Sequence, residues 1–532
     1  MKVFKRIAAI AIALTFVLTA FSADFTMVAE AKTTNSAATG VAIGGVLIQG
    51  NDVIVSTSGT AASEDGLYHL VASDVYQTAP AGADVAQQAV SAAATFSVPL
   101  AKGTATSMLY KKFTVCVVKG GALTPVSNSM YITNPEACAG RTAARVENGK
   151  KGLMADVSSA NMGMRSLAVL GAKQATVTLE LSKISYGSGT PYNYNGKTYN
   201  FNTGYISAYD NLIGRLNSQG VQVTLVLVCD ANAAGEFINP LAYDGLGAHT
   251  YYGLNATNAD GADMLAAVGS FLAARWSYFP YFGMNAHVDN FIIGNEVNAW
   301  RQWNYMNAGS MQAYTAQYAQ AFRVLYNAIK SENANAYVYT CTDHQWGFNQ
   351  GGVYGAKAFL TEFNNVIRTQ GNIDWKLAFH AYDYPLTNTA AWAPTDKIQR
   401  NQNTKFVSVY NIDVVTDFLC QPDFLSPSGA VRTVKLSEQG YTSMAGEDQQ
   451  AAAIVFAILV TNNNQYIDGI VLSREKDEPV IEMPQGLANG LMDVNNHNKM
   501  SYSFYQNAES PEIIAQASAI AGVDFNAILA QR

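Results

Sequence analysis

The chain has 532 residues, of which 49% are hydrophobic and 14% charged, and its formal net charge at pH 7 is -7. This composition is typical of a globular protein with a large buried core and excludes a disordered chain. The negative balance gives no support to nucleic-acid binding, which normally requires a basic surface.

The first segment has the three parts of a secretory signal peptide. Three basic residues precede an apolar run over residues 7–21, and the small-x-small pattern AEA follows at residues 29–31. We expect residues 1–31 to be a signal peptide cut after Ala31, with Ala23 as the other candidate, and the mature chain to be secreted. A membrane anchor is the alternative, but the run is shorter than the ~20 residues of a spanning helix. We therefore expect no membrane association after cleavage.

The next region consists of short runs rich in β-branched residues, separated by Gly, Asn and Asp. An example is GVLIQGNDVIVSTSG, residues 45–59, and the region has no convincing helical period. It predicts a small all-β, sandwich-like module over residues 40–134, with Asn134-Pro135-Glu136 at its boundary. Its residues favour a packing or binding module over a catalytic one.

From residue 140 onward, helix-like and strand-like stretches alternate. The helix-like stretches cover residues 158–170, 205–218, 261–278, 311–331, 356–369, 404–419 and 447–462, and each precedes a short apolar run. One further strand within residues 141–154 makes eight. The pattern predicts an α/β fold, a (β/α)8 TIM barrel over residues 140–532. A doubly wound sheet is the alternative, but no Gly-rich phosphate loop opens the first unit.

The active site of such a barrel lies at the carboxyl ends of its strands, so the residues at these ends are the candidate site residues. The second to eighth strands end in Glu180, Asp230, Asn295-Glu296, Asp343-His344, His380-Ala381-Tyr382, Glu438-Gln439 and Arg474-Glu475. Two glutamates therefore lie on strands four and seven, across the barrel from each other. Cleavage of a glycosidic bond needs such a pair, because one carboxyl protonates the leaving oxygen while the other attacks the sugar carbon or activates water.

Gly294-Asn295-Glu296 and Ser437-Glu438-Gln439-Gly440 resemble the motifs of clan-A-type retaining (β/α)8 glycoside hydrolases. The resemblance covers roughly residues 150–500, and the β module plus barrel is similar to a group of secreted bacterial proteins of uncharacterised function. It implies that Glu296 is the acid/base and Glu438 the nucleophile. It further implies that Asn295 contacts the sugar 2-hydroxyl, that Tyr382 orients the nucleophile, and that no cofactor or metal is needed.

The sequence departs from the clan at two strand ends. Members often carry an Arg near the end of strand two, where this chain has Glu180, and a Trp at the end of strand eight, where it has VLSREKDEP. Arg474 is the candidate replacement for the charge. The candidates for an aromatic sugar platform are Trp300, Trp303, Trp346 and Trp392, and the loops around Trp300 and Trp346 are polar, as sugar stacking favours.

The remaining substrate-binding candidates have structural alternatives. Asp230 fits the start of an Asx turn as well as it fits substrate binding. His344 and His380 fit structural histidines at the barrel mouth that make ordinary hydrogen bonds. The complete set of substrate-binding candidates is Asn295, Asp230, His344, His380, Tyr382, Trp300, Trp346, Arg474 and Glu475.

Two other functions are open to such a chain. A metal-dependent barrel hydrolase would use His344 and His380, but no HxH or HExxH occurs among the six histidines. A barrel that only binds glycans at the cell surface is the other alternative, against which both glutamates argue. We expect a retaining glycosidase whose partner is a β-linked poly- or oligosaccharide. Five widely separated cysteines show no disulfide framework, and a Cys116–Cys138 pair is left open.

Overall fold

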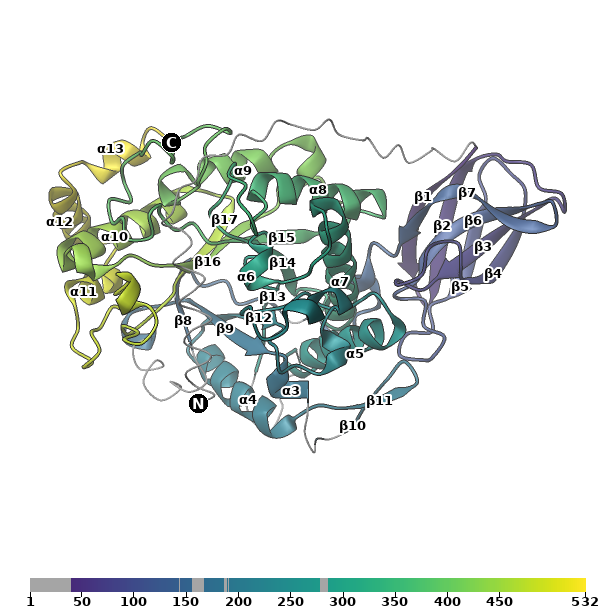
Figure 1. Cartoon of the computed structure of the whole chain (residues 1–532), viewed down its shortest axis with the longest axis horizontal. Helices are drawn as coiled ribbons and strands as arrows, with labels where there is room; N and C mark the ends of the chain where they lie inside the picture. Colours follow the sequence, from purple (N-terminus) through teal and green to yellow (C-terminus); the bar gives the residue numbers. More distant parts are fainter. Residues whose placement is uncertain (1–39, 143, 156–166, 186–188, 190, 278–285) are drawn as a thin grey trace.

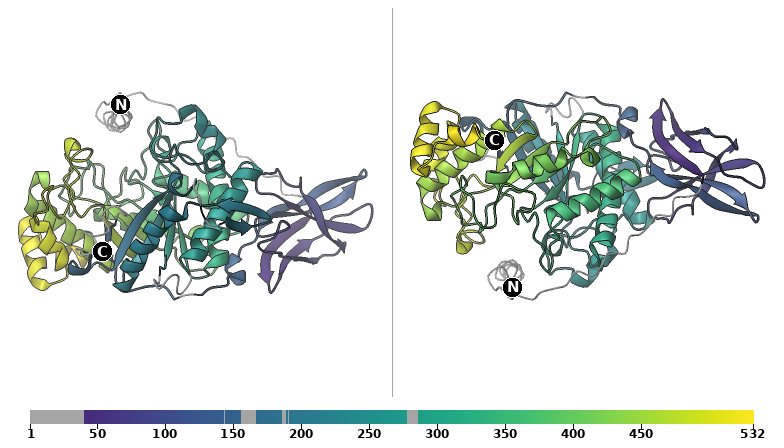
Figure 2. Two further views of the ribbon diagram at one scale, coloured as in Figure 1. Left: turned by 90° about the horizontal axis from the view of Figure 1, so that it is seen from below. Right: turned by 90° about the horizontal axis from the view of Figure 1, so that it is seen from above.

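Figure 1 shows the computed structural model of the chain, which describes residues 40–142, 144–155, 167–185, 189, 191–277 and 286–532. The expected signal peptide, residues 1–31, lies outside the described residues, as does most of the helix predicted at residues 158–170. An all-β module stands at one end of the molecule beside a larger α/β body, and both views of Figure 2 show the same arrangement.

The all-β module consists of two antiparallel sheets packed face to face. One sheet has the order β1(Val41–Gln49), β2(Asp52–Gly59), β5(Thr95–Pro99), and the other β4(Ala83–Ala89), β3(Leu67–Ser73), β6(Lys112–Lys119), β7(Ala122–Tyr131). Buried and exposed residues alternate along β1 and β2, as expected of strands with one solvated face. The buried faces supply a core that includes Val46, Val53, Phe96, Leu70 and Val115.

Eight parallel strands close the second body into a barrel. In chain order they are β8(Lys151–Met154), β9(Gln174–Glu180), β12(Gln222–Val228), β13(Asn290–Ile293), β14(Tyr337–Thr342), β15(Trp375–Phe379), β16(Val434–Gln439) and β17(Ile467–Leu472). The main intervening helices are α4(Thr203–Ser218), α5(Ala259–Arg275), α7(Met311–Glu332), α8(Ala356–Thr369), α9(Asp413–Leu419) and α10(Glu447–Asn463). The predicted (β/α)8 barrel preceded by an all-β domain is confirmed.

The helix predicted at residues 404–419 is wrong in its first half. Only η5(Val409–Asn411) and α9(Asp413–Leu419) are helical there. The Asn411 amide donates to the main-chain oxygens of Gln399 and Phe406 at 2.9 and 3.1 Å, and the Thr404 hydroxyl donates to Lys397 O at 3.1 Å. Side chains of this kind offer the backbone an alternative to helical hydrogen bonds.

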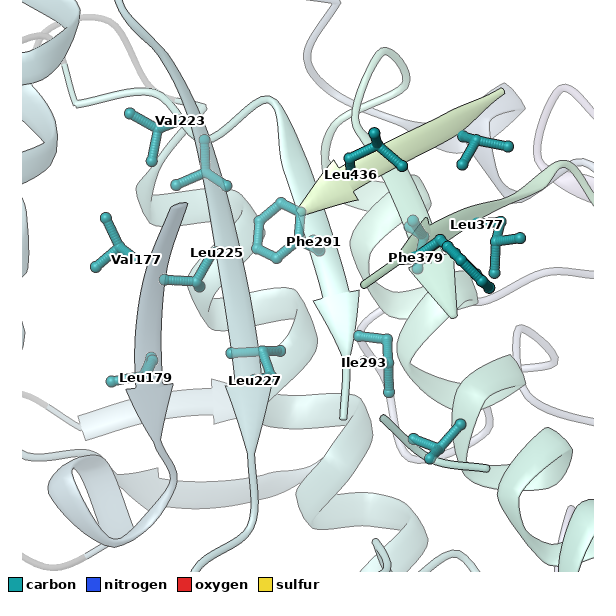
Figure 3. Close-up of a cluster of buried hydrophobic side chains, with 14 of the residues drawn as sticks. Val177, Leu179, Val223, Leu225, Leu227, Phe291, Ile293, Leu377, Phe379 and Leu436 are labelled. Carbon is teal, nitrogen blue, oxygen red and sulfur yellow. The ribbon is translucent and has the colours of Figure 1, made fainter. Parts of the chain in front are cut away.

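Two different sets of side chains cover the two faces of the barrel wall. One set of alternate residues is apolar and packs outward against the helices; Figure 3 labels ten of them, among them Val177, Leu225 and Phe291. At the amino-terminal end of the interior lies a set of polar side chains, which we call the polar floor: Gln174, Gln222, Asn290, Tyr339, Lys435 and Asp468.

The centre of the polar floor is the fully buried ammonium of Lys435. It lies 2.6 Å from Gln174 Oε1 and 3.0 Å from Asp468 Oδ1, and Asp468 also accepts a hydrogen bond from the Tyr339 hydroxyl at 2.7 Å. Gly469 leaves room for this arrangement, because a Cβ there would lie 2.1 Å from Gln174 Oε1. The buried charge is therefore paired and hydrogen-bonded, which a dry interior requires.

Helix α7 joins the two bodies. From this helix, Gln320 Nε2 donates to Val75 O at 2.8 Å, Asn327 Nδ2 donates to Leu109 O at 3.0 Å, and Glu332 Oε1 lies 3.1 Å from Lys102 Nζ. The acceptors and the lysine belong to the β module. The module is thus docked on the helical layer of the barrel by specific contacts.

Two further expectations concern disulfides and membranes. All five cysteines are free thiols, so the Cys116–Cys138 pair does not form; Cys116 is buried in β6, and Cys138 Sγ donates to Pro135 O at 3.2 Å. Over the part of the chain that the structure describes, every helix is too short or too polar to cross a bilayer.

Candidate active site

Glu296 lies in a tight turn at the carboxyl end of β13. Gly294 has φ +80°, and a Cβ at this glycine would come within 2.6 Å of Val297 Cγ1. Glu296 itself has φ +41°, in the left-handed region that residues with a side chain seldom adopt. Such strain persists only where the surroundings fix it, and it gathers at functional sites. The turn therefore aims one particular carboxylate into the barrel mouth.

His380, at the end of β15, joins the two glutamates. Its Nδ1 lies 2.8 Å from Glu296 Oε1 and 3.9 Å from Glu438 Oε2. Its Nε2 lies 3.1 Å from Ser437 Oγ and 3.5 Å from Cys341 Sγ. A buried imidazole thus contacts side chains from β14, from β16 and from the turn after β13.

The site raises the pKa of both partners in the Glu296–His380 contact. Burial raises the pKa of the Glu296 carboxyl, and the hydrogen bond and charge of His380 offset this only in part. Burial alone would lower the pKa of His380, but Cys341, Glu438 and Glu296 around it outweigh burial and raise it well above its usual value. Both shifts therefore favour the protonated forms of this pair.

Glu438 lies in a more open environment. The register of β16 against β17 shifts between Leu436 and Gln439, and an irregularity of this kind re-aims the side chain that it carries. Glu438 Oε1 accepts a hydrogen bond from the Tyr382 hydroxyl at 2.8 Å. Its side chain is 31% exposed, against 15% for Glu296. The two carboxyls thus differ in both solvation and partners.

His344 supports the segment that carries Tyr382. Its Nδ1 contacts the main-chain oxygen of Tyr382 at 2.8 Å, and its ring meets Phe406 edge-on at 5.1 Å. These contacts give His344 a positioning role, as the alternative reading of a barrel-mouth histidine anticipated.

Asn295 lines a cavity at the base of the mouth together with His380 and Glu438. Asn298, which the sequence reading missed, is fully buried; its Nδ2 donates to Asp343 Oδ1 at 2.6 Å, and its Oδ1 accepts from the Asp343 N–H at 2.8 Å. The pair ties the turn after β13 to the end of β14, so it holds the strained segment in place.

Several candidates have structural contacts. The Asp230 carboxylate accepts from the main-chain N–H groups of Ser182 at 3.1 Å and Asn232 at 3.4 Å, which favours the turn interpretation. The Arg474 guanidinium lies 2.6 Å from Glu482 Oε1; burial lowers its pKa, but the charges of Glu482 and Glu438 outweigh burial and raise it, so its charge acts on both carboxyls. Glu475 is half-buried, and its main-chain oxygen accepts from Met492 N.

The tryptophans also differ from expectation. Trp346 is fully buried with its ring edge-on to Phe418 at 5.1 Å, so the expectation of a sugar platform there is wrong. Its neighbours in the sequence are polar loop residues, but its side chain points into the core. Trp300 stacks on Tyr305 and Tyr354 at 6.0 and 5.9 Å, within an aromatic cluster of the barrel wall.

Trp303, one of the expected platform candidates, pairs near the mouth with Tyr251, which the sequence analysis did not name. Tyr251 packs on the inner apolar cluster that includes Val226 and Ile292, and its ring is 5.9 Å from that of Trp303. Burial first, and then the nearby carboxyls of Glu180, Glu438 and Asp230, raise the pKa of Tyr251. Tyr251 comes from the loop after β12, where no periodicity marks it.

Metal-ligand types do not gather in the described ranges: no three His, Cys, Asp or Glu side chains are grouped there so that they could hold a metal ion. The Glu296 and Glu438 carboxyls instead both approach one nitrogen, His380 Nδ1.

The strand order and the two strand-end glutamates place the protein in the class of (β/α)8 barrels that resemble clan-A glycoside hydrolases. The chain belongs to a family of unknown function, DUF5722, whose profile matches residues 143–527. None of the curated proteins compared with the chain matches it.

Solved structures with a similar fold share little sequence with the chain. A family 39 glycoside hydrolase from Bacteroides cellulosilyticus WH2 is 14% identical, with a TM-score of 0.45 over 88% of this chain and 79% of the other. A β-glucosidase from Pyrococcus furiosus is 12% identical, with a TM-score of 0.47 over 70% and 98%. A β-glucuronidase from an uncultured Clostridium is 11% identical, with a TM-score of 0.36 over 88% and 67%.

Proposed function

We propose that the protein is a secreted retaining glycoside hydrolase that cleaves β-linked poly- or oligosaccharides. In the first step the Glu438 carboxylate attacks the anomeric carbon while Glu296 gives its proton to the departing glycosidic oxygen. In the second step Glu296, now ionised, takes a proton from water, whose oxygen displaces Glu438 from the sugar. The second step restores both carboxyls to their starting states.

The contact of both glutamates with one histidine nitrogen carries this proposal. Because both distances start from His380 Nδ1, Glu296 Oε1 and Glu438 Oε2 can be no further apart than 2.8 Å plus 3.9 Å. Retaining enzymes hold their carboxyls ~5 to 5.5 Å apart, and inverting enzymes ~6.5 to 9.5 Å apart. The upper limit here reaches only the lower edge of the inverting range, so the geometry favours retention.

The environments of the two carboxyls support the division of roles. A general acid must be protonated before the reaction, and burial raises the pKa of Glu296 as that requires. A nucleophile must be ionised, and the Tyr382 hydroxyl donates a hydrogen bond to Glu438 Oε1, an acceptor role that a carboxylate fills. The Tyr251–Trp303 pair supplies aromatic surface near the mouth against which a sugar ring can pack.

Trapping of the covalent intermediate tests the mechanism. A 2-deoxy-2-fluoro glycoside with a good leaving group should label the enzyme, because fluorine destabilises the transition states of both steps while the leaving group still permits the first. The added mass should map to the peptide that contains LSEQGY, residues 436–441. Glu438→Ala should abolish labelling and turnover, and Glu475→Ala, at a neighbouring strand end, serves as the matched control.

Three outcomes would contradict parts of this proposal. Labelling at Glu475 would reassign the nucleophile, and an inverted anomeric product would exclude retention. Glycan binding without turnover on any of a panel of plant and microbial polysaccharides would favour the non-catalytic alternative.

Secretion is tested separately, on the exported protein. The basic start, apolar run and AEA pattern of residues 1–31 support it. The amino-terminal sequence of protein recovered outside the cell should begin at Lys32. Recovery of uncleaved chain in the membrane fraction would instead favour the anchor.

A further inference from the structure

The base of the candidate active site contains a cavity of about 10 Å³. Its polar lining includes Thr176 and Thr178 from β9, Ser437 and Glu438 from β16, and Asn295. Met154, Val226, Ile292, Cys341 and His380 form the rest of the lining. A cavity of ~10 to 15 Å³ holds one water molecule, provided that the water finds two to four polar partners.

The Thr176 side chain shows that this cavity is more than a packing defect. Thr176 is 1% exposed, and its hydroxyl makes no hydrogen bond to any other described residue. Buried hydroxyls in native proteins are nearly always satisfied by protein or by ordered water. Since Thr176 lines the cavity, a water molecule there is the partner that its hydroxyl requires.

The cavity lining also includes His380, Ser437 and the Glu438 carboxyl. His380 Nε2 lies 3.1 Å from Ser437 Oγ, and when this nitrogen carries a proton it donates to that oxygen. The Ser437 hydroxyl hydrogen is then free to point into the cavity. A water that accepts from Thr176 and Ser437 keeps both of its own hydrogens for acceptors, and the Glu438 carboxylate is the charged acceptor on the lining.

We propose that the cavity holds one structural water molecule that accepts from Thr176 and Ser437 and donates a hydrogen bond to Glu438, so that the nucleophile stays ionised. The water also closes a hydrogen-bonded path from Glu296 through His380 and Ser437 to Glu438. This inference rests on the proposed function, because it assigns Glu438 the role of nucleophile. Thr176 is then a positioning residue that acts through the water.

The test compares Thr176→Val, which removes the hydroxyl at nearly constant shape, with Thr176→Ser, which keeps it. Without the water, Glu438 should be harder to ionise, so the acidic limb of the kcat/KM profile should move about one pH unit upward, a roughly tenfold loss below the limb. Thr176→Ser should restore the wild-type limb. Thr342→Val is the matched control, because Thr342 is fully buried with an unpartnered hydroxyl but does not line the cavity.

Crystal structures of the wild type and Thr176→Val give a readout that needs no activity. The expected result is a single water density within hydrogen-bonding distance of Thr176 Oγ1 and Glu438, lost in the valine variant. An active enzyme with no such density, or a valine variant with an unshifted limb, would overturn the inference and leave the proposed function standing. The expected density in a protein that hydrolyses no glycoside would overturn the proposed function and retain only the water site.

Discussion

Glu296 combines two features that each cost stability, a buried carboxyl and a left-handed backbone. Its Oε1 contacts His380 at 2.8 Å, and its φ is +41°. Both features cost stability, because desolvation disfavours the carboxylate and the Cβ crowds its own backbone. They are tolerated because Asn298 and Asp343 lock the turn. The residue therefore trades stability for a fixed geometry at the barrel mouth.

The proposed acid/base role of Glu296 gives a prediction on leaving groups. Glu296→Ala removes the proton donor, so natural sugars should react far more slowly, roughly 10²- to 10⁴-fold, while aryl glycosides with good leaving groups lose much less, since they depart with little protonation. Steady-state kinetics on both substrate types measures the difference. Equal losses of rate on both substrate types would contradict the assignment of Glu296 as the proton donor. Added azide, a small nucleophile, should restore the second step in the variant.

The backbone of Glu296 gives a prediction on stability. At an ordinary helical position a glycine is about 0.5 to 1 kcal/mol less stable than an alanine. At φ +41° the alanine is strained and glycine is not, so Glu296→Gly should be at least as stable as Glu296→Ala. Denaturant unfolding measures both. The control is Asn365, exposed within α8, where the glycine variant should be the less stable one; the same order at both positions would refute the strain.

At the scale of elements, β3 and β4 of the module share a buried imidazole. His69 Nδ1 lies 2.7 Å from Asp84 Oδ2, and its Nε2 lies 2.9 Å from Asp65 Oδ2. Burial would lower the pKa of His69, but the two aspartates raise it overall, while hydrogen bonds from Ser63, Leu67 and His69 lower the pKa of Asp65 to about 2. His69, when protonated, therefore ties the edge strand β4 to β3 through Asp84.

A folded-state pKa above the unfolded value of ~6.5 means that this contact stabilises fully at acidic pH and is lost as the pH rises through the folded-state value. His69→Gln should therefore lower the unfolding midpoint more at about pH 6 than at about pH 9. His497, an exposed histidine 3.0 Å from Asp493, serves as the control, and His497→Gln should change little at either pH. If His69→Gln lowered the unfolding midpoint equally at both pH values, the contact of His69 with its two aspartates would stabilise through packing alone.

The same scale shows why some elements could be predicted from the sequence and others could not. The stretch at residues 356–369 coincides with α8 because its apolar period is set locally, and the strand ends carried Glu296 and Glu438 because parallel closure brings all carboxyl ends together. The helix predicted at residues 404–419 does not form over residues 404–408, because the side chains of Thr404 and Asn411 bind main-chain atoms outside this segment. Tyr251 and Cys341 were missed, since only tertiary packing brings them to the site.

At the scale of the whole molecule, α7 is packed on both sides. Its Gln320, Asn327 and Glu332 side chains bind the β module, while the same helix covers the barrel. Asn327 is fully buried, so separation of the two bodies would expose polar groups that are satisfied only by the contact. The two bodies should consequently unfold as one unit.

Probes confined to each body can check this cooperativity. The six tryptophans all lie between residues 276 and 392, so their fluorescence reports on the barrel, while labelling of the buried Cys116 reports on the module. The two denaturation midpoints should coincide. Asn327→Ala should lower both midpoints together, because it reduces the free energy of unfolding by about 1 to 3 kcal/mol. A module that opens at lower denaturant than the barrel would contradict this expectation.

The polar floor has a consequence for how the barrel chooses its alignment. A slip of one residue would turn Lys435 outward among the apolar contacts of the helices, and inward–outward alternation already forbids that. A slip of two residues keeps every side chain on its own face, so hydrophobic patterning alone tolerates it. It would nevertheless move the Lys435 ammonium toward Val226 and Ile292, away from Gln174 and Asp468, whose contacts offset the cost of its burial. The pairing of one buried charge thus disfavours the two-residue shift of register that apolar packing alone would permit. It also fixes the position along the barrel axis of Glu438, three residues further along β16, relative to Glu296.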